Sequence, residues 1–332
     1  MLIRYIIKRI LLAIPVLLVI SFFVFMMIQL PPGNYLDTLI EQMENEGQVD
    51  MVRIQNLKDR YHFDQPDYIK YFYWITGFVH GDLGKGFSND TEVTETLKKY
   101  VPVTAAISIF TILLTWSIAI PFGISAAVKK NTVWDYLLTF IGLAAMATPG
   151  FVIALVFQVV MRKMSPEYDP TGLVSSGVAE LPWYSAAKIW DLLKHLFVPV
   201  FILGVAGTAG MIRIMRANVI DELKKQYVLC ARARGLHPAL VVLRYPVRVA
   251  INPFMSNIGL ILPRIISGSL IVSVVLGLPT LGPVVLAAIM GQDTYLAASC
   301  VFVQCVLAIV GILVSDIMLS LVDPRIRFGA KA

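Results

Sequence analysis

The run ILLAIPVLLVISFFVFMMIQL, residues 10 to 30, is uncharged and apolar over 21 residues. A helix needs about 20 such residues to cross the hydrocarbon core of a bilayer. Arg4, Lys8 and Arg9 precede the run, as in a secretory signal. The run is longer than the apolar region of about 7 to 15 residues typical of signal peptides, and no small-x-small cleavage pattern follows it. We therefore expect residues 1–30 to stay in the protein as an N-terminal transmembrane anchor.

Similar runs recur along the chain, at residues 101 to 128, 136 to 161, 196 to 212 and 294 to 315. Residues 249 to 292 are interrupted only by Arg264 and are too long for one helix. The turn-forming sequence that starts at Gly277-Leu278-Pro279 would end a helix near Leu276. The composition agrees, because only 15% of residues are charged and the mean hydropathy is +0.74. The sequence thus predicts an all-α, polytopic membrane protein with six transmembrane helices.

Basic residues are concentrated in alternate loops. The loop 213–248 carries eight Lys or Arg against two acidic residues, whereas residues 31 to 100 carry seven basic and twelve acidic ones. The short loop at Lys129 and Lys130, and the tail with Arg325, Arg327 and Lys331, add to the same side as 213–248. Because basic residues favour the cytoplasmic side, both termini are predicted to be inside. This pattern accounts for the net charge of +6, so we expect no nucleic-acid partner.

The long outer segment opens with Pro31-Pro32-Gly33 and contains an aromatic stretch, Tyr68 to Ile75. Such rings suit a membrane interface or a docked partner, although we favour a small periplasmic subdomain packed on the helices. The expected organisation is an anchor at 1–30, a periplasmic subdomain at 31–100, a transmembrane core at 101–322 and a cytoplasmic tail at 323–332.

Signals of catalysis and of resident metals are absent from the sequence. There is no GxxxxGK[ST] nucleotide-binding motif, so any ATPase must be a separate chain. Cys230, Cys300 and Cys305 lack metal-ligand spacing. The four histidines, His62, His80, His195 and His237, are scattered and are interpreted as surface or interface residues. We therefore expect a protein that is not itself an enzyme.

The first part of the basic loop favours a helix, and Gly235 with Pro238 is typical of a helix stop. Its small residues allow a close approach by another protein, and its arginines offer planar donors. The stretch from Tyr227 to Leu236, YVLCARARGL, with Pro253 after it, resembles the coupling motif of binding-protein-dependent ABC importer permeases of the dipeptide and oligopeptide branch.

Further pieces of that resemblance extend over nearly the whole chain. They are His80-Gly81-Asp82-Leu83-Gly84, Ile120-Pro121-Phe122-Gly123 with Ala126-Ala127-Val128-Lys129, Pro279-Thr280-Leu281-Gly282, and Asp323-Pro324-Arg325-Ile326-Arg327. The resemblance implies a type I ABC importer permease in a bacterial or archaeal inner membrane. Its implied partners are a second homologous permease, two ATPases that bind ATP and Mg, a periplasmic or lipid-anchored binding protein, and membrane lipid.

By the same resemblance, residues 227 to 238 form a coupling helix that sits in a cleft of an ATPase. The implied contact residues are Tyr227, Cys230, Ala231, Arg232, Ala233, Arg234, Gly235 and Leu236. The broader family has a glutamate where this chain has Leu229, which puts one specific salt bridge in doubt. Relatives carry peptides, but some carry oligosaccharides or nickel. Many have a glutamate where Ser273 stands, so the path here is less acidic, which favours a ligand other than a cationic peptide.

Two other classes of protein remain as alternatives: an ion-coupled secondary transporter, for which this chain offers few intramembrane acids and no convincing repeat, and a structural membrane anchor. Charged groups inside spans face cavities or partners, because an exposed charge there is costly. Arg264 either lines the path or pairs with Asp316 or with an acidic group of a second subunit, and Asp316 is expected to be structural. Pro149-Gly150 and the glycines Gly204, Gly207 and Gly210 are expected to form close helix contacts.

Overall fold

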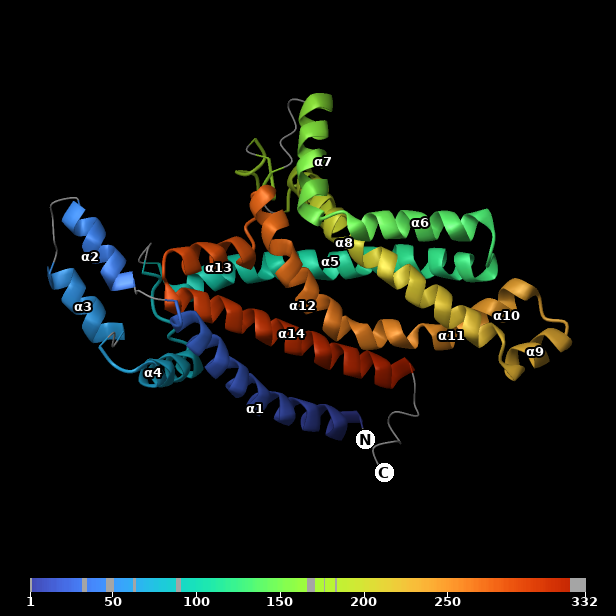
Figure 1. The fold of residues 1–332 in the computed structure, drawn as a ribbon, viewed down its shortest axis with the longest axis horizontal. Helices are drawn as coiled ribbons and strands as arrows, with labels where there is room; N and C mark the ends of the chain where they lie inside the picture. The colour runs from blue at the N-terminus through green and yellow to red at the C-terminus, as the bar shows by residue number, and fades with distance from the viewer. Residues whose placement is uncertain are drawn as a thin grey trace. The chain divides into compact units, whose positions relative to one another are not determined.

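The computed structural model describes residues 2–31, 35–45, 51–61, 64–87, 91–165, 171–175, 177–182 and 184–322 (Figure 1). Pro32, Gly33, His62 and the tail motif from Asp323 onward lie outside the described residues. The regular elements in these ranges are helices, with a single bridge between Lys85 and Glu92. They form two compact units: one contains residues 8–104 and 280–307, and the other contains residues 105–279 with the two ends of the described chain.

The first unit is built on most of α1 (Leu2–Gln29), α2 (Tyr35–Asn45), α3 (Met51–Tyr61) and α4 (Asp67–His80), with the beginning of α5 (Val93–Val128), α13 (Leu281–Met290) and the first half of α14 (Thr294–Val322). Its core is aromatic: Phe25, Trp74, Tyr295 and Phe302 are all buried. The Trp74 indole donates a 3.0 Å hydrogen bond to the Ser299 hydroxyl. Trp74 of the aromatic stretch therefore packs inside this unit, with Tyr71 beside it, whereas Tyr68, Phe72 and Tyr73 are exposed.

The His80-to-Gly84 motif forms a tight turn at the end of α4. Gly81 has φ +82°, a left-handed conformation that glycine adopts without a steric penalty. The Asp82 carboxylate accepts a 2.9 Å hydrogen bond from the Gly84 N–H.

The buried carboxylate of Asp293 caps α14 by accepting a hydrogen bond from the Leu296 N–H at 3.0 Å. It also accepts one from the Phe87 N–H at 2.6 Å.

The second unit contains the rest of α5, α6 (Val133–Ala147), α7 (Gly150–Met164), α8 (Ala186–Leu223), α12 (Asn252–Val275) and the end of α14. Three short helices lie between α8 and α12: α9 (Gln226–Ala233), α10 (Pro238–Arg244) and α11 (Pro246–Ala250). The core cluster centred on Met215, Val219 and Phe254 joins α5, α8, α11 and α12. A Cβ on Gly123 would lie 2.5 Å from the Met215 Cβ, so only glycine permits this contact.

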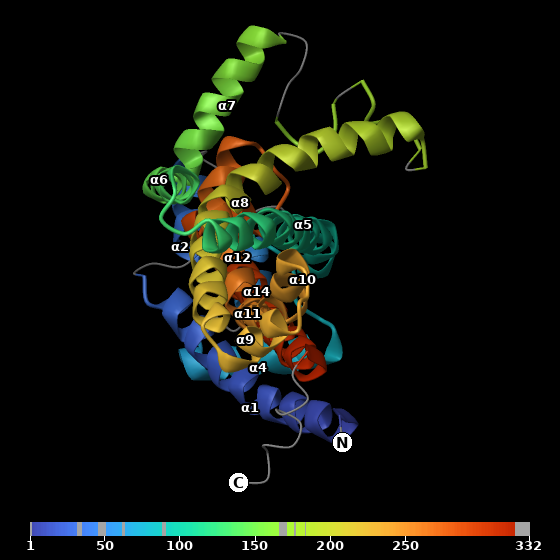
Figure 2. The same cartoon turned by 90° about the vertical axis from the view of Figure 1, so that its right-hand side faces the viewer.

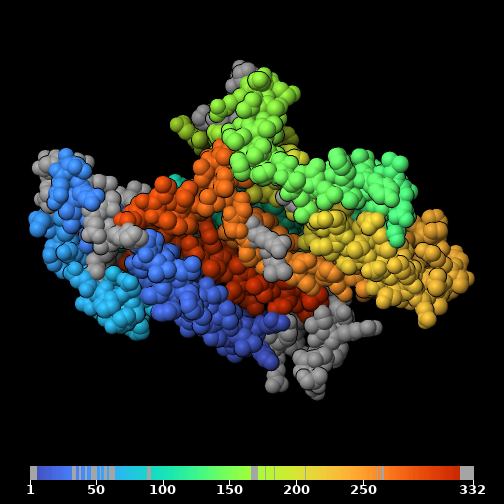
Figure 3. Space-filling view, in the orientation of Figure 1, coloured from blue at the N-terminus to red at the C-terminus, as the bar shows by residue number. Residues whose placement is uncertain are grey.

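The prediction of one continuous helix over residues 136 to 161 is wrong. The structure has α6 and α7, which meet at an angle of 94° around Thr148 and Pro149. Proline lacks the N–H that a helix interior needs and pushes the preceding residue out of the helical region, and Thr148 has ψ 119°. Figures 1 and 3 show α7 turned away from the direction of α6.

The fourth predicted span, residues 196 to 212, is part of a longer helix. α8 continues through Arg213 to Leu223 because no glycine or proline interrupts it after Gly210, so the basic loop begins at Lys224 instead of residue 213. The two parts of the helix, Ala186–Val205 and Gly207–Leu223, meet at an angle of 51°. The bend is visible in Figure 2. Cβ atoms on Gly204 and Gly207 would lie 3.5 and 3.8 Å from the Thr115 hydroxyl oxygen. These two glycines therefore lie close to α5, as predicted, whereas Gly210 faces open space.

Three described helices are long and apolar enough to cross a membrane: Ile6–Gln29, Val93–Val128 and Thr294–Leu321. The number rises to five if the bent pairs α6 with α7 and the two halves of α8 each count as one span. α12 includes a shorter apolar helix, Ile265–Val275, and ends next to Leu276 as its turn-forming sequence predicts. The all-α, multi-pass architecture is thus confirmed.

Candidate functional site

The basic loop folds into a short helix, α9, that packs on a small apolar contact, which we call its seat. Lys224 and Lys225 interrupt the chain after α8, and α9 runs from Gln226 to Ala233, shorter than the predicted 227–238. Val228 and Ala231 are buried and pack with Val241 of α10, surrounded by half-buried Leu223, Leu236 and Tyr245. One face of α9 is therefore fixed by small apolar contacts.

Gly235 ends this helical segment. Its φ of +75° lies in the left-handed region, and its N–H donates to the Arg232 carbonyl at 3.0 Å. No atom lies within 4 Å of a Cβ built at this position. The chain therefore uses glycine here for its backbone conformation, while the space beside Gly235 is open. Pro238 then starts α10 at a position where a missing N–H costs nothing.

The outer face of α9 is exposed. Leu229, Cys230, Arg232, Ala233 and Arg234 are all on the surface. Of the eight residues expected to contact an ATPase, Ala231 instead points inward and Leu236 is half-buried. The structure thus divides the eight predicted residues into those that face the seat and those on the exposed surface, which include Arg232 and Arg234.

Tyr227 links α9 to the end of α8. Its hydroxyl donates a hydrogen bond to the Glu222 carboxylate. Burial, and then this bond and the negative charge of Glu222, raise the pKa of Tyr227 to about 12. The phenol is therefore a neutral donor throughout the physiological range, and the bond restrains the break between the two helices.

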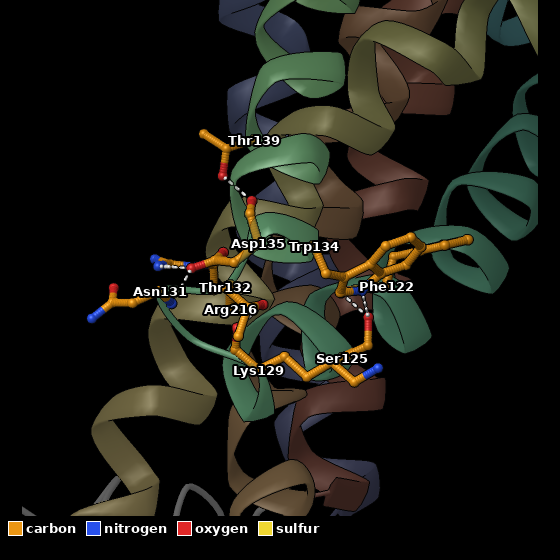
Figure 4. Close-up of polar contacts among 9 residues, drawn as sticks. All are labelled: Phe122, Ser125, Lys129, Asn131, Thr132, Trp134, Asp135, Thr139 and Arg216. Carbon is orange, nitrogen blue, oxygen red and sulfur yellow. Dashed lines mark hydrogen bonds and ion pairs between the residues drawn. The ribbon is translucent and has the colours of Figure 1, made fainter.

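A charged pair that the sequence reasoning missed lies on α6 and α8 (Figure 4). The Arg216 guanidinium donates from Nε to one Asp135 oxygen at 2.6 Å and from an Nη to the other at 2.7 Å. The Asp135 side chain is 3% exposed and that of Arg216 is 29% exposed. A bidentate pair of this kind is strong and directional. The available signal was a lone acid at the start of an apolar helix and the arginines Arg213 and Arg216 in the continuation of α8.

The turn before α6, residues 129–132, is ordered around that acid. Asn131 has φ +62°, and its N–H donates to an Asp135 oxygen at 3.0 Å. The Trp134 indole N–H donates to the Ser125 hydroxyl at 3.1 Å, and its ring packs near Phe122. Arg216 lies about two helical turns before the end of α8. The α5–α6 turn is therefore joined to the part of α8 that leads into α9.

A cavity of about 640 Å³ opens between α5, α7, α8 and α12. Among the described residues that line it, none is charged, and the polar side chains are Thr111, Thr115 and Asn257. Its remaining wall is apolar or glycine: Gly150, Ile202, Leu203, Gly207, Gly210, Met211, Ile214, Ile261, Ile265, Gly268 and Val272. The glycines leave room that larger side chains would fill, and the described lining is mainly apolar with three uncharged polar side chains.

Arg264 lies in the middle of α12, and its side chain is outside the described residues. Asp316 is half-buried on α14. Their pairing and a role in a pathway therefore stay predictions.

The His80 ring bonds the Thr76 carbonyl at 2.7 Å, and the His195 ring bonds the Asp191 carbonyl at 2.8 Å. Within the described part of the chain, no group of three metal-binding side chains occurs.

Comparison with known proteins identifies the family. Residues 119–328 match the binding-protein-dependent transport system inner membrane component, and residues 1–108 match the N-terminal region of the corresponding membrane component. The short helices α9, α10 and α11 and the Asp135–Arg216 pair all fall inside the larger match.

Individual relatives align over nearly their whole length. The oligopeptide transport system permease protein AppB of Bacillus subtilis is 30% identical over 98% of this chain and 99% of the relative. The oligopeptide permease OppB of Salmonella typhimurium is 27% identical, and the dipeptide permease DppB of Alkalihalophilus pseudofirmus is 26% identical, with the same coverage. The chain therefore belongs to the binding-protein-dependent transport system inner membrane components, the non-catalytic, multi-pass permease subunits of ABC transporters.

Proposed function

We propose that this permease subunit forms, with a homologous second permease, the path of an ABC importer for dipeptides or oligopeptides. ATP and Mg are bound by two separate ATPase subunits, and a periplasmic or lipid-anchored binding protein delivers the cargo. The peptide assignment rests on the relatives, whose names specify oligopeptide and dipeptide transport.

The observation that carries the proposal is the two-sided α9. Val228 and Ala231 hold the helix on α10, while Cys230, Arg232 and Arg234 face outward. A coupling element must be held firmly by the permease on one face and be accessible to the ATPase on the other. In our proposal an ATPase binds the exposed face, and its movement on nucleotide binding tilts α8 through the Tyr227–Glu222 contact.

The cavity beside the glycines of α8 is proposed as this subunit's share of the path. In its described lining, Thr111, Thr115 and Asn257 offer uncharged polar groups to the backbone of a peptide. Arg264 is retained as either a pathway residue or a partner of Asp316 or of an acid of the second permease. Uptake with unchanged affinity in an Arg264→Gln variant would exclude the pathway role.

We further propose the type I arrangement with six spans, in which α12 supplies the span beyond the five counted above, and with both termini inside. In this arrangement 1–30 is an anchor, 31–100 is periplasmic, 101–322 is the core and 323–332 is a cytoplasmic tail. A membrane-impermeant maleimide tests the orientation in a Cys230→Ser background. Thr132→Cys should react only from the cytoplasmic side and Asp64→Cys only from the outside; the reverse pattern would reject this topology.

Reconstitution tests the function itself. The complete complex in liposomes should hydrolyse ATP faster when loaded binding protein is added, and Cys230 should form a disulfide with a cysteine placed in the facing ATPase cleft. Uptake by this chain alone, driven by an ion gradient, would support a secondary transporter instead. Competition among peptides, oligosaccharides and nickel for the partner binding protein identifies the cargo.

A further inference from the structure

A second cavity, separate from the glycine-lined one, lies between α5, α6 and α8. It has a volume of about 340 Å³ and is open along one side; we call it the lateral groove. Its walls include Ile118, Leu137, Ile141, Phe201, Val205 and Ile212. Nothing in the proposed coupling or transport path uses this groove.

Small residues hollow out the groove. Gly142 on α6 faces Ala209 on α8, where an added Cβ would lie 3.4 Å from the alanine Cβ, and Ala145 continues the same wall. Its described polar groups are already satisfied, because the Thr208 hydroxyl donates to the Gly204 carbonyl at 2.7 Å and the Trp134 indole donates to Ser125. The lining therefore offers a dry, apolar surface with no free hydrogen-bonding group among these side chains.

One end of the groove is aromatic and cationic. Trp134 and Phe122 line it with their ring centroids 6.1 Å apart. Figure 4 shows the Lys129 side chain on the same side of the α5–α6 turn as these rings. The Asp135 carboxylate points to the opposite side, where Arg216 neutralises it. Lys129 and the neighbouring Lys130 are exposed, so the turn presents positive charge beside an apolar channel.

We infer that the lateral groove binds one anionic phospholipid, with an acyl chain between α5, α6 and α8 and the headgroup at Lys129 and Lys130. Tryptophan at the membrane interface and lysines between helices on the cytoplasmic side are the groups that recognise such a lipid. The inference rests on the proposed orientation, which places the α5–α6 turn at the cytoplasmic surface. Labelling of Thr132→Cys reads that orientation independently.

A peptide is a poor occupant of this groove. Its backbone N–H and C=O groups would lose their hydrogen bonds to water without finding partners among the described side chains of the groove. A hydrocarbon chain has no such groups, and the exposed lysines complement the negative charge of an anionic lipid headgroup. The charge at the mouth thus favours an anionic lipid over an uncharged apolar surface.

Site-specific photocrosslinking in the complete transporter tests this inference. Ile141, which lines the groove and is 54% exposed, is replaced by p-benzoylphenylalanine in membranes that contain phosphatidylglycerol and phosphatidylethanolamine. After irradiation, mass spectrometry should find this chain joined to phosphatidylglycerol, enriched about fivefold over its bulk fraction, the effect of about one lysine at the headgroup. The same probe at Val156 on α7 should give adducts that follow the bulk composition.

Charge and volume variants identify the groups responsible. Lys129→Gln with Lys130→Gln should remove the enrichment, whereas Arg162→Gln with Lys163→Gln, which loses the same charge at the end of α7, should preserve it. Ala145→Phe should fill the groove and reduce all lipid adducts at Ile141. An adduct to the second permease, or lipid adducts at the bulk ratio in the unmodified background, would overturn the inference.

Discussion

The α6–α8 contact lies near the end of α8, and the α9–α10 contact follows that end. Different forces hold the two contacts. Asp135 and Arg216 join the first through two short charged hydrogen bonds. Val228, Ala231 and Val241, with half-buried Leu223, Leu236 and Tyr245 around them, hold the second by apolar packing. The difference predicts that the α5–α6 turn moves with α8, and that the exposed face of α9 is the face available to the proposed ATPase partner.

The largest effect is expected at Gly235, on the open side of α9. Gly235→Asp places a charge in the surface that an ATPase would cover, and an unpaired buried charge costs about 3 to 5 kcal/mol, more than about 100-fold in binding. We expect peptide uptake to be lost while membrane insertion is normal.

Gly235→Asn is the matched control, because asparagine has nearly the same shape and also tolerates a left-handed backbone. If the charge is responsible, uptake falls far less in this variant. Normal uptake by Gly235→Asp would refute the coupling role of this surface.

The charged pair should show an asymmetry. Arg216→Gln leaves the almost fully buried Asp135 without its partner, whereas Asp135→Asn leaves a half-exposed arginine that water can reach. We expect the free energy of unfolding to fall by about 2 to 3 kcal/mol in Arg216→Gln and by about 1 kcal/mol in Asp135→Asn. The thermal midpoint of the complex should fall by roughly 5 °C and 2 °C respectively.

The double variant completes a thermodynamic cycle for this pair. If the two side chains interact, the double variant should lose less stability than the two single variants lose together. Strict additivity would show that the pair does not hold α6 to α8.

The features of the sequence that predicted structure well were local. Apolar runs located the membrane helices, and Gly235 and the turn after Leu276 marked two helix ends. The Asp135–Arg216 pair was invisible because its members are 81 residues apart and Arg216 was assigned to a loop. The inner and outer faces of α9 could not be separated, since an eight-residue helix gives too little periodicity. The apolar run across Pro149 led to the prediction of one continuous helix, and the 94° angle between α6 and α7 depends on tertiary packing.

Removing two methyl groups from the seat of α9 should have a smaller effect than breaking the charged pair. Val228→Ala loses about 1.5 kcal/mol of apolar burial, at about 0.8 kcal/mol for each carbon. The α9 amides should then exchange with deuterium about tenfold faster, while exchange in α6 is unchanged. Leu229→Ala, on the exposed face, should leave exchange unchanged and weaken ATPase association instead. Equal exchange in the two variants would mean that α9 is not held by this seat.

The smallest effect is expected at Tyr227, where one hydrogen bond of about 1 kcal/mol joins α9 to the end of α8. Tyr227→Phe keeps the ring but loses the bond to Glu222, so ATP hydrolysis should respond less to loaded binding protein, by a few-fold.

The pKa of Tyr227 gives this contact its own signature. Because folding raises the pKa from 10.0 to about 12, the contribution of this contact to stability is present below pH 10 and is lost as the pH rises through about 12. The ultraviolet difference between the titrations of the native protein and Tyr227→Phe should therefore have its midpoint near pH 12. A midpoint near pH 10 would mean that the phenol is free in water, and that α9 is joined to α8 by its backbone and by the Val228 seat alone.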